Sequence, residues 1–159
     1  MASAKRSAGL LLFRRGPRQE IQVLLVHPGG PFWARKDDGV WTVPKGEHDE
    51  DEDPLEAARR EFAEETSHHP EGPFHSLSPV RQKSGKVVLA WAVEGDFDPA
   101  RLHSNTFELE WPPKSGRKRE FPEVGRAAWF GLEEAAEKIR PEQKPFLEEV
   151  RRVAREAAR

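Results

Sequence analysis

The chain has 159 residues, enough for one domain over residues 1–159 that buries about two thirds of its unfolded surface. Charged residues make up 34% of it, yet the net charge is only −2, so composition gives no general case for binding nucleic acid or acidic membranes. The absence of cysteine excludes disulfides, thiolate metal sites and a cysteine nucleophile, and it fits a reducing cytoplasm.

Two apolar segments near the N-terminus have strand character. Residues 7–14 and 21–26 predict strands joined by a turn at Gly16-Pro17. The second segment is almost wholly apolar, as in a strand that is covered on both faces. The apolar run 10–13 is too short for a signal-peptide core or a membrane span, so we expect a cytoplasmic protein without a membrane partner.

A loop with turn residues at both ends follows at residues 27–39. Its middle carries Phe32, Trp33, Arg35 and Lys36, and aromatic rings beside cations form the composition that stacks a base and meets phosphate. Trp33, Arg35 and Lys36 are therefore candidate substrate-binding residues. The alternative is a surface loop whose tryptophan packs back onto the core.

Residues 40–44 are expected to be extended and to lead into the acidic stretch 46–67. This stretch predicts a helix from Pro54 to about Thr66. Asp53 is a good N-cap, Pro54 suits the first helical position, and Glu56 stands where a capping box places its acid.

Two neighbouring stripes follow from the helical repeat of about 100° per residue. The first is apolar and can be buried; it consists of Leu55, Ala58 and Phe62. The second consists of Glu61, Glu64 and Glu65, whose like charges destabilise an isolated helix by a few tenths of a kcal/mol per pair. A divalent cation would neutralise them, and Mg²⁺ typically uses one or two carboxylates together with waters and substrate phosphates. The alternative is an ordinary solvated helix face.

The rest of the chain predicts four strands, a basic turn and two helices. In order these are the hairpin 80–83 and 86–93, the strand 107–111, the turn 112–119, the strand 123–130, and the helices 132–139 and 142–158. The apolar strand 86–93 is expected to be central in the sheet. Lys83, at the end of the first hairpin arm, is a further candidate for substrate binding. Four cations in the turn either contact substrate phosphate or only add solubility; they are Lys114, Arg117, Lys118 and Arg119.

The spacing of the acidic stretch resembles the Nudix box of the Nudix hydrolases, G-x5-E-x7-R-E-U-x-E-E-x-G-U, in which U is apolar. The matching residues are Gly46, Glu52, Arg60, Glu61, Phe62, Glu64 and Glu65. Two residues differ from the motif: Ser67 stands where the motif has its final glycine, and His68 stands at the last apolar position. Both lie after the acidic stripe, so they affect the expected end of the helix more than the expected metal site. The sequence at residues 128–135, AWFGLEEA, is also similar to the strand and following helix near the C-terminal end of that fold. The resemblance implies an α/β (α+β) protein: an α/β/α sandwich with a mixed β-sheet between helices.

The resemblance also implies chemistry: hydrolysis of a nucleoside diphosphate linked to another group, with Mg²⁺ or Mn²⁺. It implies metal ligands in Glu61, Glu64, Glu65 and the carbonyl of Lys45. Arg60 bonded to Glu52 would hold these ligands in place. The catalytic set is therefore expected to be Glu64, Glu61, Arg60 and Glu52, and the general base is Glu61, Glu64 or a later carboxylate such as Glu120 or Glu123.

Pro44-Lys45-Gly46 is similar to the diadenosine polyphosphate hydrolase branch, and the Lys45 cation is expected at the mouth of the acidic site to bind substrate. The expected partner is a small nucleotide, and the protein is expected to be a monomer or homodimer. Two other functions stay open. One is a nucleotide sensor without turnover; the other is a structural protein whose acidic run 49–53 binds Ca²⁺, although that run lacks the EF-hand pattern.

Overall fold

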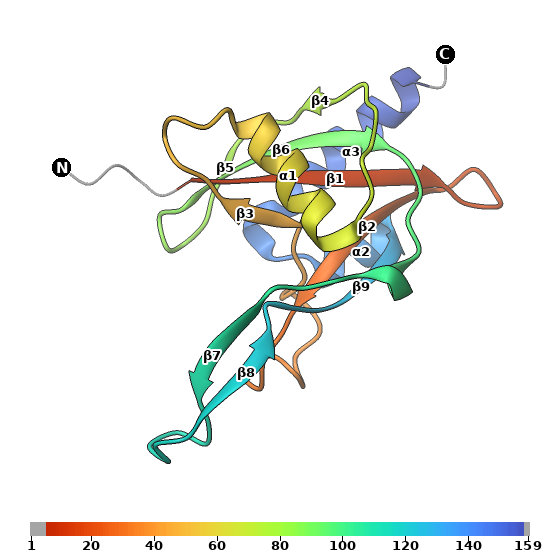
Figure 1. Ribbon diagram of the computed structural model, residues 1–159. Coiled ribbons are helices and arrows are strands. Elements are labelled where there is room, and N and C mark those ends of the chain that lie inside the picture. Colours follow the sequence, from red (N-terminus) through yellow and green to blue (C-terminus); the bar gives the residue numbers. More distant parts are fainter. Residues whose placement is uncertain (1–5, 158–159) are drawn as a thin grey trace.

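The computed structural model describes residues 6–157. Their main element is a mixed sheet of seven strands (Figure 1). The strands are β1 (Arg6–Arg15), β2 (Ile21–Pro28), β3 (Lys45–Glu47), β4 (His75–Ser76), β5 (Val80–Arg81), β6 (Val87–Glu94) and β9 (Val124–Gly131). Their order is β4–β6–β1–β2–β9, with β3 paired to β1 and β5 paired to β6. β1 and β6 are parallel, and the other neighbours are antiparallel.

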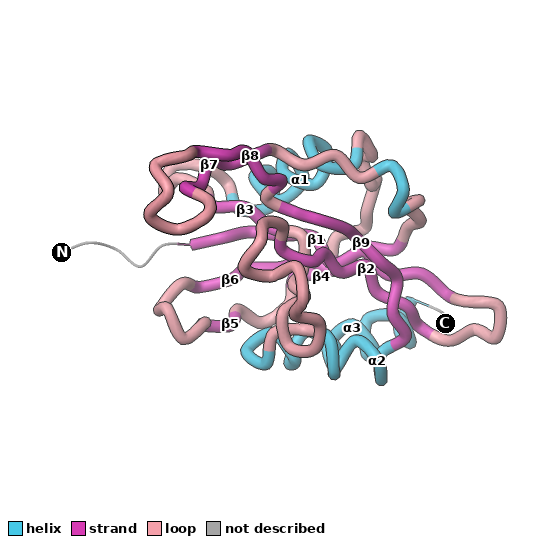
Figure 2. The backbone as a smooth tube through the Cα atoms, turned by 90° about the horizontal axis from the view of Figure 1, so that it is seen from below, coloured by secondary structure: helices cyan, strands magenta, loops and turns pink. Residues whose placement is uncertain are grey.

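Helices cover both faces of this sheet (Figure 2). α1 (Pro54–Thr66) lies on one face, and α2 (Leu132–Lys138) and α3 (Lys144–Ala157) lie on the other. Along β1, Leu10 and Leu12 belong to the core under α1, whereas Leu11 and Phe13 belong to the core under α3. Because side chains alternate along a strand, such an apolar strand needs cover on both faces. The predicted α/β/α sandwich is thus confirmed.

The predicted hairpin around Ser84-Gly85 is present as β5 and β6. The central strand is β1, however, because only the short strands β4 and β5 lie beyond β6. α3 begins at Lys144, after a 3-10 turn at Pro141–Gln143, and position 158 lies outside the described residues. Within the described residues, no helix is long and apolar enough to cross a membrane.

Both ends of α1 are capped. At its start the Asp53 carboxylate accepts from the Glu56 amide at 3.1 Å, as predicted. At its end Ser67 has φ 58° and ψ 18°, the left-handed conformation in which helices usually place glycine. This conformation explains why the resembling motif has glycine at the position, and Ser67 adopts it here with its amide bonded to the Ala63 carbonyl at 2.7 Å. The His68 ring fills the apolar position next to it, 6.4 Å from the Phe62 ring.

A separate two-stranded ribbon projects from the sheet (Figure 1). Its strands are β7 (Thr106–Glu110) and β8 (Lys118–Pro122). The predicted strand 107–111 corresponds to β7, but the turn is shorter than the predicted range 112–119, since Lys118 and Arg119 belong to β8. The sequence KREFP has a single aromatic residue among charged ones, so it lacks the apolar alternation that would have revealed a strand.

Candidate active site

β3 brings the main chain directly against the acidic stripe of α1. A Cβ atom added to Gly46 would lie 2.3 Å from Cδ of Glu61, closer than any real contact allows. Only glycine permits this approach of a strand to a carboxylate. The pairing of β3 with β1 and the packing of α1 on the same face of the sheet hold the two parts together.

Replacing Gly46 by alanine is therefore expected to displace the Glu61 carboxylate. Because the sequence predicts Glu61 as a ligand of Mg²⁺, the Mg²⁺ concentration needed for half-maximal activity is expected to rise roughly 10- to 100-fold, the usual effect of disturbing the support of a metal ligand. A Mg²⁺ titration of activity checks this. Gly131→Ala is the matched control, because a Cβ at Gly131 meets no atom within 4 Å. An unchanged Mg²⁺ requirement in Gly46→Ala would contradict the expectation.

Arg60 connects the acidic loop to the acidic stripe. Its Nη1 contacts the Glu52 carboxylate, as the sequence predicted, and its Nη2 lies 3.4 Å from Oε1 of Glu61. Its Nε lies 3.7 Å from Oε1 of Glu64. One guanidinium thus touches three carboxylates, which places the four residues of the predicted catalytic set in one cluster.

Glu65 is the buried carboxylate of the stripe. It is only 5% exposed, and among residues 6–157 no donor or cation bonds to its carboxylate. Burial, together with the charges of Glu61, Glu123 and Glu64, raises the pKa of Glu65 to about 8. Burial also raises the pKa of Glu61; the Arg60 hydrogen bond opposes this shift, and Glu64 and Glu123 add to it. The site therefore resists carrying its full negative charge without a cation.

Glu123, at the base of the ribbon, is the later carboxylate that reaches this cluster. It acts on the pKa of both Glu61 and Glu65, and its amide donates to the Asn105 carbonyl at 2.8 Å. Glu120 lies on the exposed ribbon opposite Glu108. Of the two later carboxylates that the sequence offered as bases, Glu123 is the one whose charge raises the pKa of Glu61 and Glu65.

The Lys45 ammonium lies elsewhere than expected. Side chains alternate along a strand, so Lys45 faces away from Glu61 when Gly46 faces toward it. Burial, together with the positive charges of Lys86 and Arg140, lowers the pKa of Lys45 to about 8, and the Glu47 carboxylate partly opposes this shift. The cation predicted at the mouth of the acidic stripe thus belongs to a cationic group on the other face of β3.

The carbonyl of Lys45 is differently placed. The His48 amide bonds to the Arg6 carbonyl at 3.3 Å, and hydrogen-bonded pairs alternate with open pairs along an antiparallel ladder. In the register of β1 and β3, Gly9 and Lys45 form an open pair. The Lys45 carbonyl therefore points away from β1 and is free to accept a ligand.

The other predicted substrate residues are not gathered around the acidic stripe. Lys36 Nζ lies over the Trp33 ring at 5.1 Å, and Arg35 is exposed on the same loop. Lys83 is exposed in the β5–β6 turn, whereas Lys86 reaches Glu47 at 2.7 Å.

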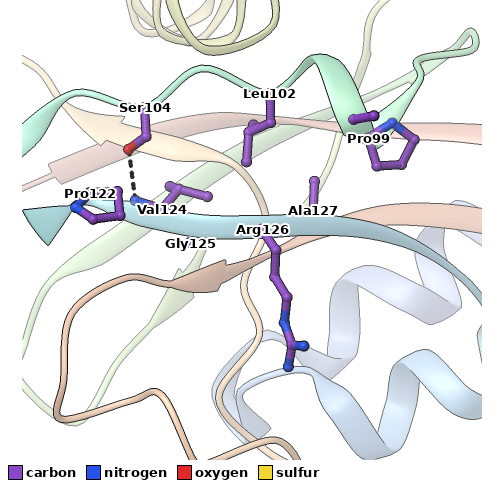
Figure 3. A pocket seen from close by; sticks show the side chains of 9 residues that line it. Pro99, Leu102, Ser104, Pro122, Val124, Gly125, Arg126 and Ala127 are labelled. Carbon is purple, nitrogen blue, oxygen red and sulfur yellow. Dashed lines mark hydrogen bonds between the residues drawn. The ribbon is translucent and has the colours of Figure 1, made fainter.

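A cavity of about 520 Å³ lies beside Glu123, between the 3-10 turn Pro99–Arg101 and the start of β9 (Figure 3). Most of the residues that line it have apolar side chains, and they include Leu102, Val124 and Ala127. Ser104 Oγ accepts from the Val124 amide at 2.8 Å and closes one end. The Arg126 side chain points away from it (Figure 3) and lies over the Trp41 ring at 5.1 Å. Nothing in the sequence marked this cavity, because its two walls are distant in the chain.

These residues fit a hard divalent cation. Within residues 6–157, no three His, Asp or Glu side chains converge closely enough to form a complete metal site by themselves. Mg²⁺ needs only one or two carboxylates, since waters and substrate phosphates complete its shell. The buried Glu65, the adjacent Glu61 and the outward carbonyl of Lys45 supply oxygen donors of the required kind.

A family model described as NUDIX domain matches residues 4–150. The asymmetrical bis(5′-nucleosyl)-tetraphosphatase of Rattus norvegicus is 36% identical over 109 residues, 60% of this chain and 69% of that protein. The Mus musculus enzyme of the same name is 35% identical over 104 residues, 57% of this chain and 65% of that protein. Among solved structures, a C. elegans Ap4A hydrolase binary complex is 25% identical with a TM-score of 0.63, over 94% of this chain and 97% of that one. The NUDIX domain of Shewanella oneidensis NrtR with ADP ribose is 20% identical with a TM-score of 0.65, over 96% of this chain and 89% of that one.

Proposed function

Since the chain belongs to the Nudix family, we propose that it is a divalent-metal-dependent hydrolase that cleaves a phosphoanhydride bond of a dinucleoside polyphosphate. The observation that carries this proposal is the buried Glu65 carboxylate next to Glu61, without a neutralising partner among the described residues. The curated relatives, named as tetraphosphatases, support the substrate class. An NTP is the second candidate substrate. We also place the protein in the cytoplasm, in keeping with its lack of cysteine.

Glu61, Glu65 and the Lys45 carbonyl would hold Mg²⁺ or Mn²⁺, and Glu64 would bind a further ion or its water. A bound cation lowers the pKa of its water and neutralises charge on the phosphate oxygens. Arg60, fixed by Glu52, keeps Glu61 and Glu64 in position.

Hydrolysis requires a water oxygen to bond to phosphorus while the bond from phosphorus to the bridging oxygen breaks. A carboxylate takes the proton of the water, and the bridging oxygen leaves with the second product. Glu64 and Glu123 are the two candidates for this base. Glu64 is half exposed on the stripe, with 48% of its side chain accessible, and Glu123 approaches the stripe from the ribbon.

One further feature supports a nucleotide substrate. The cavity beside Glu123 has a volume suited to a nucleoside.

A panel of substrates with Mg²⁺ tests the proposal: Ap4A, NTPs, oxidised dGTP, ADP-ribose and NDP-sugars, with identification of the products. We expect Ap4A to give ATP and AMP. Release of pyrophosphate from NTPs alone would favour the second substrate class. Binding without turnover of any compound would instead support a nucleotide sensor on the same fold.

A further inference from the structure

The loop that contains Phe32 runs along one side of the β7–β8 ribbon, from its base to its tip. A Cβ added to Gly29 would lie 1.8 Å from the Pro122 carbonyl, and one added to Gly30 would lie 3.1 Å from the Phe107 ring. Farther out, the Phe32 and Trp111 rings meet edge to face, 5.4 Å apart. Two segments that are distant in the sequence therefore form one surface.

The strand register defines which side chains the ribbon presents on this surface. Phe107 pairs with Phe121 and Leu109 pairs with Arg119. One step beyond, the Trp111 amide donates to the Arg117 carbonyl at 2.9 Å. Because alternate residues share a face, these six side chains lie together with Phe32, and Glu108, Glu110, Glu120 and Lys118 lie on the reverse face.

This surface contains an exposed aromatic ring and two guanidinium groups without an acidic partner among the described residues. Phe32 is 57% exposed, the one large hydrophobic side chain of the described residues with such exposure. Arg119 lies over the Phe121 ring at 5.7 Å. Within residues 6–157, neither Arg117 nor Arg119 has an acidic group within 4 Å. An exposed ring beside unpaired guanidinium groups is suited to a base and its phosphates.

The surface also has a defined position relative to the acidic stripe. The ribbon begins at Glu123, which acts on Glu61 and Glu65. Arg117 lies six positions before Glu123 along the extended chain, so the tip lies roughly 20 Å from this end of the acidic cluster. That position suits the end of a substrate remote from the cleaved bond.

We propose that Phe32, Trp111, Arg117 and Arg119 form a subsite for the distal nucleotide of a dinucleoside polyphosphate. The base stacks on the exposed face of Phe32, beside Trp111, and the arginines meet the phosphate oxygens that precede it. This inference rests on the proposed hydrolysis of such a substrate. The overall charge of −2 favours a single small nucleotide over a long nucleic-acid strand at this surface.

The test compares Ap4A with adenosine 5′-tetraphosphate, which keeps the phosphate chain and lacks the second nucleoside. For Phe32→Leu, kcat/KM for Ap4A should fall about tenfold more than kcat/KM for adenosine 5′-tetraphosphate, because only Ap4A has a second base to stack. Phe32→Trp keeps an aromatic face and should restore the wild-type ratio. This rescue separates stacking from mere support of the loop.

Arg119→Glu tests the charged part of the subsite, and Lys118→Glu is its matched control on the reverse face of the same strand. Arg119→Glu should weaken Ap4A binding about tenfold, measured by calorimetry without divalent metal, and Lys118→Glu should leave it near the wild-type value. Equal losses in both variants, or an unchanged substrate ratio in Phe32→Leu, would overturn the subsite. A wild-type protein that binds Ap4A through these residues without hydrolysing it would overturn the proposed function and leave the subsite standing.

Discussion

Glu65→Gln and Glu64→Gln are each expected to lower kcat by about 10²- to 10⁴-fold while the fold stays intact. Loss of a ligand weakens charge stabilisation worth several kcal/mol, and each 1.36 kcal/mol changes the rate tenfold. Loss of a proton acceptor has an effect of similar size. Glu65→Gln should not unfold the chain, since it removes a carboxylate that burial already disfavours.

Steady-state kinetics on the best substrate of the panel, at saturating Mg²⁺, measure this effect, and circular dichroism checks the fold. Glu56→Gln is the matched control on the same helix, because Glu56 is exposed and pairs with Arg59 at 3.1 Å, away from the cluster. Wild-type rates in Glu65→Gln or Glu64→Gln would refute the assignment of the acidic stripe as a metal platform.

In the absence of divalent metal, the free energy of unfolding is expected to fall as the pH rises from about 5 to about 8. The pKa of Glu65 is about 8 in the folded protein and 4.5 ordinarily. Between these values the folded state holds a proton that the unfolded state has lost, so a rise in pH favours unfolding. The shift corresponds to a loss on the order of 4 kcal/mol, and the raised pKa of Glu61 acts in the same direction.

Urea unfolding at several pH values with a chelator measures this slope. Glu65→Gln should remove most of the decrease in the free energy of unfolding with rising pH, whereas Glu56→Gln should retain this decrease. Mg²⁺ should restore stability at pH 8, because a ligand that binds only the folded state stabilises it. A flat profile in the wild-type protein would show that Glu65 has its ordinary pKa in the fold.

Local patterns were sufficient to predict α1 and its acidic stripe. The cap at Asp53 and the helical spacing of Glu61, Glu64 and Glu65 depend on neighbours in the sequence, and the structure reproduces them. The contact of Arg60 with Glu52 was also predictable, because the family spacing already contains it.

What could not be predicted depends on long-range pairing. The direction of the Lys45 side chain is set by the register of β3 against β1, and a slip of one residue would reverse it. The approach of Glu123 to Glu65 requires the ribbon to return to the sheet at that residue. The contact of Phe32 with Trp111 joins segments about half the chain apart, and neither segment alone indicates it.

The ribbon is fastened at its base. Glu123 and Val124 are bonded there through their amides to Asn105 and Ser104. Bending of a hairpin held in this way would displace the tip most and the base least, so Glu123 would keep its place relative to Glu65. Under the proposed subsite, substitutions from Trp111 to Arg119 are expected to change which nucleotides bind and to leave the acidic cluster in place. Substrate range would then evolve separately from hydrolysis in this chain.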